Sequence, residues 1–211
     1  MSAGPDVLCY RCTNESPGAI AMGLCVKKGD RILSVLGSGD QAFALLEYAD
    51  YVKAVEVGML QAQYALERKE ALKRGDAETF LRFIRAMKRR PAGSYFNPHE
   101  DYFNDERIAK LMKKAGQIDI VQADIFRDEM GIDGFNKVYL SNAATYPGNK
   151  PEDVNAFLER LALALAEPGL VYMSQRPDTI IIPSRFSLDE QLTETARKQE
   201  YGWFPCVYRK A

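Results

Sequence analysis

Residues 31–58, RILSVLGSGDQAFALLEYADYVKAVEVG, constrain the fold more than any other stretch of the chain. An apolar run stops at a turn that contains Gly37 and Gly39, a helical pattern follows, and a second apolar run ends at Glu56. Short apolar runs bounded by turn residues are typical of buried strands, and glycine allows the backbone to turn sharply beside a ligand. The stretch therefore predicts a strand, a helix and a second strand in a βαβ unit.

The same alternation continues along the chain, with a helix-poor stretch near its end. We expect further helices at residues 17–28, 60–74, 77–90, 105–116, 151–169 and 188–198, and further strands at 118–124, 135–146, 170–176, 179–186 and 202–210. Strands that alternate with helices indicate an α/β fold with a mainly parallel sheet, and the closing strands suggest an antiparallel edge. The prediction is a Rossmann-like three-layer sandwich in one domain, residues 1–211, with residues 1–30 as an N-terminal helical lid and 77–115 as a helical insertion.

Charge and hydropathy narrow the choice of partners. The chain has 28 basic and 29 acidic residues, a formal net charge of −1, which gives no general attraction to nucleic acid. The basic residues of MKRR at 87–90, with Lys113 and Lys114, suggest an RNA-facing patch as one alternative, but they are also typical of solvated helix faces, which is the interpretation that we favour. No segment approaches the roughly 18 consecutive apolar residues of a membrane span, and the first residues do not resemble a signal peptide. We expect a cytoplasmic protein with no nucleic-acid partner and no membrane span.

The cysteines raise the question of metal or redox chemistry. Cys9 and Cys12 form a CxxC motif, but Cys25 and Cys206 provide no second one, and His99 is the only histidine. A closed zinc site needs four ligands. We therefore expect no metal site and reduced cysteines.

Acidic residues follow the predicted strands at positions that suit a nucleoside. Glu56 lies 19 residues after Gly37, the separation at which a carboxylate can accept both ribose hydroxyls. Asp124, at the end of a later strand, is placed to meet an adenine amino group. The alternative is an ordinary tight turn at Gly37 and Gly39 with Glu56 as a solvated strand end. The combination favours a nucleoside site.

The turn itself discriminates between nucleoside cofactors. Residues 37–42, GSGDQA, have polar residues where the nicotinamide-binding fingerprint requires a third glycine. The chain also has no phosphate-binding GxxxxGK motif. Asp40 would repel a pyrophosphate but could hold an ammonium group. S-adenosylmethionine has an α-amino group, a sulfonium and no phosphate, and it is the cofactor that we expect.

Three segments resemble the betaine-lipid synthase A-type family: CYRCTNESPGAIAMGL, ILSVLGSGDQAFALL and KAVEVGMLQAQYALERKEAL. The positions that carry the resemblance are Tyr10, Glu15, residues 39–42 (GDQA), Glu56, and Gln61 or Gln63. The resemblance implies a class I S-adenosylmethionine-dependent methyltransferase-like fold. It also implies transfer of the 3-amino-3-carboxypropyl group, with release of 5′-methylthioadenosine.

A displacement at a sulfonium carbon depends on alignment, and a hydroxyl acceptor would also need a base. The candidate catalytic residues are Tyr10, Glu15, Asn142 and Tyr146. The candidate cofactor-binding residues are Gly37, Ser38, Gly39, Asp40, Gln41, Glu56, Val57, Asp124, Ile125, Ser141 and Asn142. Three simpler interpretations stay open: Asn142 as a turn cap, Tyr10 as a core aromatic, and Tyr172 as packing rather than pocket lining.

The function predicted is therefore transfer of the aminocarboxypropyl group to a small-molecule acceptor, or its intramolecular cyclisation. A plain methyltransferase shares every cofactor residue named above, and a non-catalytic nucleoside-binding module is a further alternative. The sequence leaves the acceptor and the oligomeric state open.

Overall fold

The computed structural model describes residues 8–88, 102–128, 131–174, 180–200 and 202–211. The predicted polar loop at 91–104, with His99, lies mostly outside these residues, as do Arg89 and Arg90 of the MKRR stretch.

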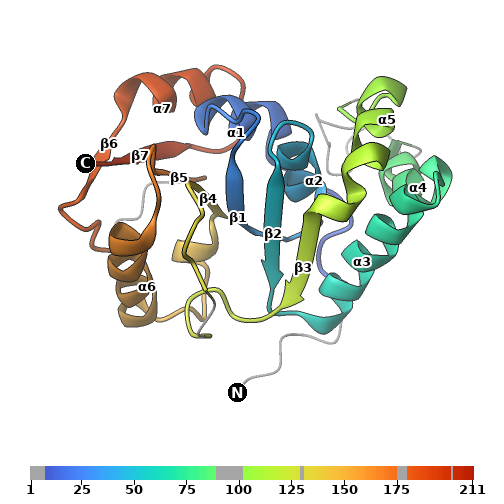
Figure 1. The fold of residues 1–211 in the computed structure, drawn as a ribbon. Helices are drawn as coiled ribbons and strands as arrows, with labels where there is room; N and C mark the ends of the chain where they lie inside the picture. Colours follow the sequence, from blue (N-terminus) through green and yellow to red (C-terminus); the bar gives the residue numbers. More distant parts are fainter. Residues whose placement is uncertain (1–7, 89–101, 129–130, 175–179, 201) are drawn as a thin grey trace.

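A seven-stranded sheet forms the centre of the molecule, in the order β3-β2-β1-β4-β5-β7-β6 (Figure 1). The strands are β1 (Arg31–Val35), β2 (Tyr51–Glu56), β3 (Ile118–Gln122), β4 (Lys137–Ser141), β5 (Leu170–Met173), β6 (Phe186–Leu188) and β7 (Cys206–Lys210). β1 to β5 pair in parallel, and β7 is antiparallel to both β5 and β6. The predicted parallel sheet with an antiparallel edge is confirmed, and strand order reverses between β1 and β4.

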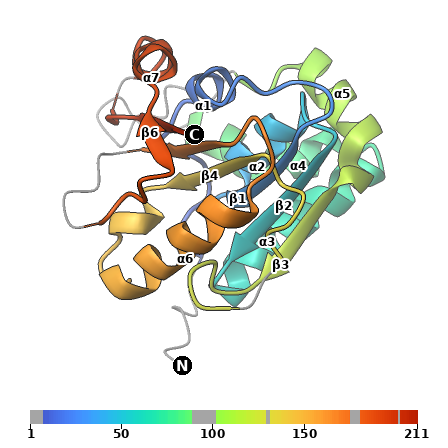
Figure 2. The same cartoon turned by 60° about the vertical axis from the view of Figure 1, so that its left-hand side comes forward.

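Helices cover both faces of this sheet, which gives the three predicted layers. They are α1 (Pro17–Gly23), α2 (Asp40–Leu46), α3 (Met59–Lys73), α4 (Ala77–Lys88), α5 (Asp105–Lys114), α6 (Pro151–Ala164) and α7 (Glu190–Arg197), with short 3-10 turns at Ala115–Gln117 and Ala143–Thr145. Figure 2 shows α6 in front of the sheet and α2, α3 and α4 behind it.

Two apolar cores result from the alternation of side chains along the strands. Ile32 of β1 packs into the core beneath α1 to α5 and α7, whereas its neighbour Leu33 packs into the core beneath α6. Both side chains are fully buried. Each such burial stabilises the fold by about 1.5–3 kcal/mol, so the sheet is held firmly from both sides.

Several predicted boundaries change in the structure. The strand predicted at 179–186 is wrong: residues 180–183 are not a strand, and β6 begins only at Phe186. The strand expected to reach Asp124 ends at Gln122, because the Asp124 carboxylate accepts the Phe126 N–H at 3.0 Å and turns the chain. The first helix ends at Gly23, since Cys25 takes a left-handed conformation with φ of 46°.

None of the helices in the described ranges is long and apolar enough to cross a membrane.

Candidate nucleoside site

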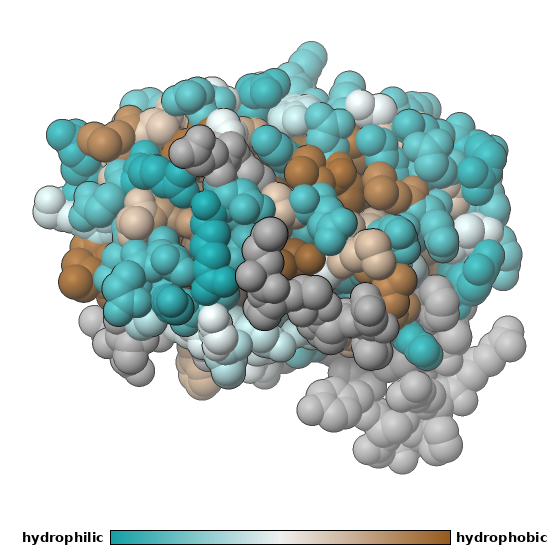
Figure 3. All heavy atoms as spheres, turned by 90° about the horizontal axis from the view of Figure 1, so that it is seen from below, coloured by the Kyte–Doolittle hydropathy of each residue, from teal (hydrophilic) through white to brown (hydrophobic). Residues whose placement is uncertain are grey.

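A cavity of about 610 Å³ opens at the edge of the sheet where β1 to β4 end. Figure 3 views the molecule from this side, where brown apolar surface lies among polar side chains. In an open α/β sheet, ligands bind at the carboxyl ends of the strands, next to the point where strand order reverses. The volume is in the range of small-molecule sites.

Most of the predicted site residues line this cavity, although they come from distant parts of the sequence. The lining includes Tyr10, Glu15, Gly37, Ser38, Gln41, Glu56, Val57, Asp124, Ile125, Ser141, Asn142 and Tyr146. Gly39 and Asp40 are not among the lining residues.

The turn after β1 has the backbone conformation that its glycines predicted. Gly37 has a φ of 52° and Gly39 a φ of 88°, both in the left-handed region that side chains disfavour. A Cβ on Gly37 would meet no heavy atom within 4 Å, so the turn leaves open space on the cavity. α2 begins immediately after this turn, at Asp40.

Glu56 connects the turn after β1 with the end of β2. Its carboxylate accepts the N–H of Gly58 at 2.9 Å and also bonds the backbone N–H groups of Gly37 and Val57. Burial raises the pKa of Glu56, and these N–H groups partly oppose the rise. A half-buried carboxylate is thus fixed in position at the cavity wall.

The end of β3 supplies a mixed polar and apolar wall. Asp124 is half-buried, and its neighbour Ile125 is 6% exposed. Val57, after β2, is 50% exposed and lines the same cavity. Apolar side chains beside a carboxylate suit a flat heterocycle that carries an amino group.

The segment before α1 lines the cavity and is hydrogen-bonded to α3. The Gln61 side chain accepts the Tyr10 N–H at 2.9 Å and donates to the Tyr10 carbonyl at 2.6 Å. The Tyr64 hydroxyl donates to the carbonyl of Arg11 at 2.9 Å. Six residues between Cys9 and Glu15 therefore form a wall of the cavity that the sheet itself does not provide.

Asp40 is used within the protein, which corrects its expected role as an ammonium ligand. One carboxylate oxygen pairs with buried Arg68 at 2.7 Å. The other accepts the Thr13 N–H at 2.7 Å and the Ser38 hydroxyl at 3.1 Å. Asp40 anchors the N-terminal segment from behind the cavity wall, because both of its oxygens are engaged and the side chain is only 1% exposed.

Glu15 lines the cavity and lies among hydroxyl groups. Its Oε2 accepts the Tyr139 hydroxyl at 2.9 Å and the Ser174 hydroxyl, and its Oε1 accepts the Ser141 hydroxyl. Glu15 is 2% exposed, and burial raises its pKa, an effect that the three hydroxyls partly oppose.

Ser141 and Asn142 follow β4 in an unusual backbone conformation. Ser141 has a φ of 53°, and the pairing of β4 with β5 shifts register beside it. Left-handed backbone at a residue other than glycine is strained, and such strain gathers at functional sites. Asn142 is half-buried at the cavity, and its Oδ1 lies 3.4 Å from the Ser141 hydroxyl. The Asn142 side chain makes no capping hydrogen bond to the following turn.

The tyrosines near the site divide between rim and core. Tyr10 is 45% exposed, so it is not a core aromatic. Burial of its hydroxyl and a hydrogen bond with Tyr146 raise the pKa of Tyr10 to about 12. Tyr172 is fully buried and is not among the lining residues, so its packing interpretation is correct.

Several lining residues were not predicted from the sequence. They include Cys9, Cys12, Thr13, Gln61, Arg127, Tyr139 and Trp203, together with residues of the loop after Tyr146. Gln61 could have been predicted, since it is one of the positions that carry the family resemblance. Arg127 could also have been predicted, because it closely follows the strand whose end carries Asp124. Trp203 could not have been predicted, because only the tertiary structure brings the segment before β7 to the cavity. No group of metal-ligating side chains that could hold an ion occurs in the part of the chain that the structure describes.

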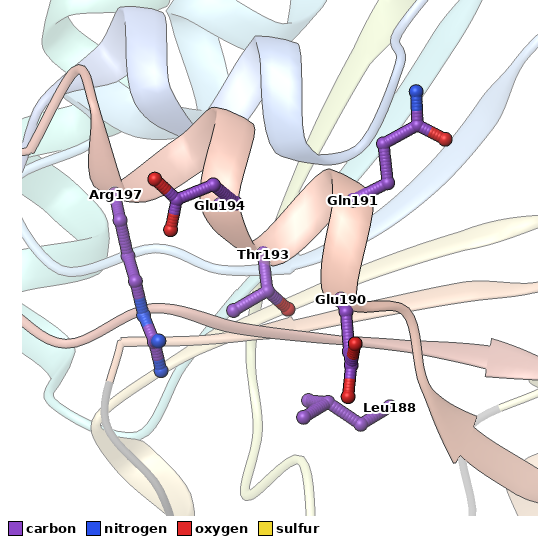
Figure 4. Close-up of a pocket in the computed structure, with 6 residues that line it drawn as sticks. All are labelled: Leu188, Glu190, Gln191, Thr193, Glu194 and Arg197. Atoms are coloured by element: carbon purple, nitrogen blue, oxygen red, sulfur yellow. The ribbon is translucent and has the colours of Figure 1, made fainter.

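A second hollow, of about 510 Å³, lies beside α7 (Figure 4). Arg197, Thr193 and Glu190 point to the same side of the helix, Gln191 points to the opposite side, and Glu194 extends sideways. The Thr193 hydroxyl already bonds the Val207 backbone, with a distance of 2.9 Å from the Val207 N–H. The hollow therefore offers mainly solvated charged side chains and is the weaker candidate.

No protein-family model and no curated protein matches the sequence. Solved structures do match. A Clostridium thermocellum protein assigned as an rRNA methylase has a TM-score of 0.51 at 10% identity, over 92% of this chain and 95% of that one. A Streptococcus mutans protein solved in complex with S-adenosylhomocysteine has a TM-score of 0.52 at 8% identity, over 92% of this chain and 96% of that one. The [4+2]-cyclase SpnF has a TM-score of 0.51 at 10% identity, over 92% of this chain and 79% of its own.

These likenesses establish the fold. The chain has the Rossmann-like fold of class I S-adenosylmethionine-dependent methyltransferases, as predicted. The narrower resemblance to betaine-lipid synthases stays a prediction.

Proposed function

We propose that this chain binds S-adenosylmethionine in the cavity and transfers its 3-amino-3-carboxypropyl group to a small-molecule acceptor, or cyclises that group. 5′-Methylthioadenosine would be the second product. S-adenosylmethionine supplies an electrophilic carbon beside a positively charged sulfur. The residues of the chain hold the nucleoside, align the acceptor and exclude water.

The observation that carries the cofactor assignment is the position of Glu56. Its half-buried carboxylate lines the cavity and is held by backbone N–H groups after β1 and β2, which supports a role in binding a pair of ribose hydroxyls. Asp124 and Ile125 would then meet the base. Glu56 would repel a 2′-phosphate, which argues against a ligand with a phosphorylated ribose.

The charges of the lining also fit this cofactor. Glu15, Glu56 and Asp124 are carboxylates, and Arg127 is the one cationic side chain among the described lining residues. An acidic cavity attracts a ligand with a net positive charge, such as S-adenosylmethionine, and disfavours a nucleoside phosphate. The same charges argue against the phosphodiester backbone of RNA as acceptor, although one protein of this fold is assigned as an rRNA methylase.

Transfer of the aminocarboxypropyl group is favoured by the segment from Tyr10 to Glu15, which carries the family resemblance and lines the cavity. Methyl transfer is the second candidate, because a protein of the same fold was solved with S-adenosylhomocysteine, the product of methyl transfer.

Incubation of the purified protein with S-adenosylmethionine and a cell extract separates the two reactions. Release of 5′-methylthioadenosine together with an acceptor heavier by the aminocarboxypropyl group would support the proposal. Release of S-adenosylhomocysteine would replace it with methyl transfer. Tight binding without turnover would indicate a nucleoside-binding module.

The cofactor site is tested by Glu56→Gln, which keeps the size of the side chain and removes its charge. Lost charge-assisted hydrogen bonds should weaken binding of S-adenosylmethionine by about 1–3 kcal/mol, measured by calorimetry. The matched control is Glu70→Gln, at an exposed carboxylate on α3. Equal affinities for the two variants would remove Glu56 from the site.

A further inference from the structure

Glu15 is a buried carboxylate with no cation beside it in the described part of the chain. Its partners are the neutral hydroxyls of Tyr139, Ser141 and Ser174. A buried charge is normally paired, because removing a lone charge from water costs much free energy. A bound cation would therefore stabilise the ionised form of Glu15, which no cation in the described part of the chain does.

One acceptor position of this carboxylate is left for a ligand. Two hydroxyls bond Oε2, and a single hydroxyl bonds Oε1. A carboxylate offers about four acceptor positions, so Oε1 can accept one more hydrogen bond. Because Glu15 lines the cavity, a ligand with a hydrogen-bond donor can fill that position.

The site of Glu15 is separate from the expected nucleoside half of the cavity. Its hydroxyl partners lie on β4 and directly after β5, whereas Glu56 ends β2 and Gly37 follows β1. The strands that hold Glu15 are thus on the other side of the point where strand order reverses. A ligand at Glu15 would occupy the acceptor half.

We propose that Glu15 binds the ammonium group of a primary aliphatic amine and accepts its proton, which makes an amine the acceptor of the transferred group. This inference rests on the function proposed above and names its acceptor class. An ammonium group supplies both the positive charge that Glu15 lacks and the donor that Oε1 can accept.

The proton and electron movements balance over three steps. The ammonium gives one proton to the Glu15 carboxylate, which leaves a neutral amine with a free electron pair. That pair forms a bond to the carbon beside the sulfonium, and the carbon–sulfur pair returns to sulfur to give a neutral thioether. The carboxyl group of Glu15 then releases its proton to water, and the product amine keeps a positive charge.

The surroundings of Glu15 suit a proton acceptor. Burial raises its pKa, and a base works best when its pKa lies near the working pH. The groups that face it are Tyr139 and Ser141 of β4, Tyr172 of β5, Ser174, and Glu200 after α7. Tyr172 stays neutral, since burial raises its pKa further. Glu200 raises the pKa of Glu15 by repulsion.

The test compares amines with diols of matched length. The protein is incubated with S-adenosylmethionine and either 1,4-diaminobutane or 1,4-butanediol, and 1,5-diaminopentane with 1,5-pentanediol is a second pair. We expect mass spectrometry to find transfer to the amine of each pair and none to the hydroxyl. Glu15→Gln should slow amine transfer at least 100-fold and change the affinity for S-adenosylmethionine less than threefold.

Two further variants make the outcome decisive. Glu47→Gln replaces another buried glutamate, one that pairs with Arg107 away from the cavity lining, and should keep full transfer. Ser174→Ala removes one hydroxyl donor from Glu15, which raises the carboxyl pKa, so the rise of kcat with pH should shift to higher pH.

The results distinguish failure of the proposed function from failure of the inference about Glu15. Absence of S-adenosylmethionine binding to the unmodified protein would overturn the function proposed above, and this inference with it. Normal cofactor binding combined with transfer only to diols, no transfer to any amine probe, or undiminished transfer in Glu15→Gln would overturn this inference alone. A large loss of cofactor affinity in Glu15→Gln would do so too, because the carboxylate would then hold the cofactor.

Discussion

Gln61 bonds both backbone groups of Tyr10, its amide oxygen accepting the N–H at 2.9 Å and its amide nitrogen donating to the carbonyl at 2.6 Å. The two residues are 51 positions apart in sequence. This pair fixes the N-terminal segment over the cavity in the way that one strand is fixed to another. The cavity therefore depends on a side chain that faces away from solvent on α3.

Gln61→Ala should release this segment. Loss of two hydrogen bonds, each worth about 1 kcal/mol, should weaken S-adenosylmethionine binding and increase amide hydrogen exchange at residues 8–16. Gln63→Ala is the matched control, since Gln63 is exposed on the same helix. Equal exchange at residues 8–16 in the two variants would contradict the prediction.

Asp40 should matter for stability through Arg68. Both side chains are buried, and their atoms approach to 2.7 Å. Arg68→Met leaves an unpaired buried carboxylate and should lower the free energy of unfolding by about 3–5 kcal/mol in urea denaturation. Lys73→Met breaks the exposed pair with Glu70 and should cost less than about 1 kcal/mol. Similar costs for the two variants would show that the buried pair is not a structural anchor.

Glu15 should make stability depend on pH. Burial raises its pKa above the ordinary 4.5, so above that pH the folded state binds more protons at this group than the unfolded state. The contribution of Glu15 to the free energy of unfolding therefore falls as pH rises through this window. The stability of Glu15→Gln relative to the unmodified protein should increase from pH 5 to pH 8 in urea denaturation.

The control for this pH effect is Glu70→Gln. The Glu70 carboxylate is exposed, and Lys73 lowers its pKa, so it titrates below this pH range. Its effect on stability should be constant from pH 5 to pH 8. A constant difference for Glu15→Gln as well would mean that burial does not perturb Glu15.

Asn142→Ala should affect turnover more than binding. Asn142 lines the cavity directly after β4, and its side chain makes no capping bond to the following turn. We expect the affinity for S-adenosylmethionine to change by less than about 1 kcal/mol and kcat to fall about 10-fold or more, through poorer alignment of the acceptor. Asn104→Ala, at the cap of α5, is the control that should lower stability and leave kcat unchanged. A normal kcat for Asn142→Ala would show that Asn142 has no catalytic part.

The sequence by itself determined the sheet, the glycine turn and the position of Glu56. Strands buried on both faces must be apolar along their length, and a left-handed turn favours glycine. The local sequence pattern therefore predicts the strands and the turn directly. The strand predicted at residues 179–186 is wrong because an apolar run with a proline satisfies the same pattern without pairing.

Only the tertiary structure decided what Asp40 and Glu15 do. Asp40 stands beside the predicted turn in sequence, yet its partners are Arg68 and Thr13, and Glu15 meets Ser141 across 126 positions. The sequence shows that a side chain can carry a charge. Whether that charge is neutralised depends on the distant groups that the folded core brings within hydrogen-bonding distance. The burial that shifts the pKa of such a side chain is a property of the whole fold.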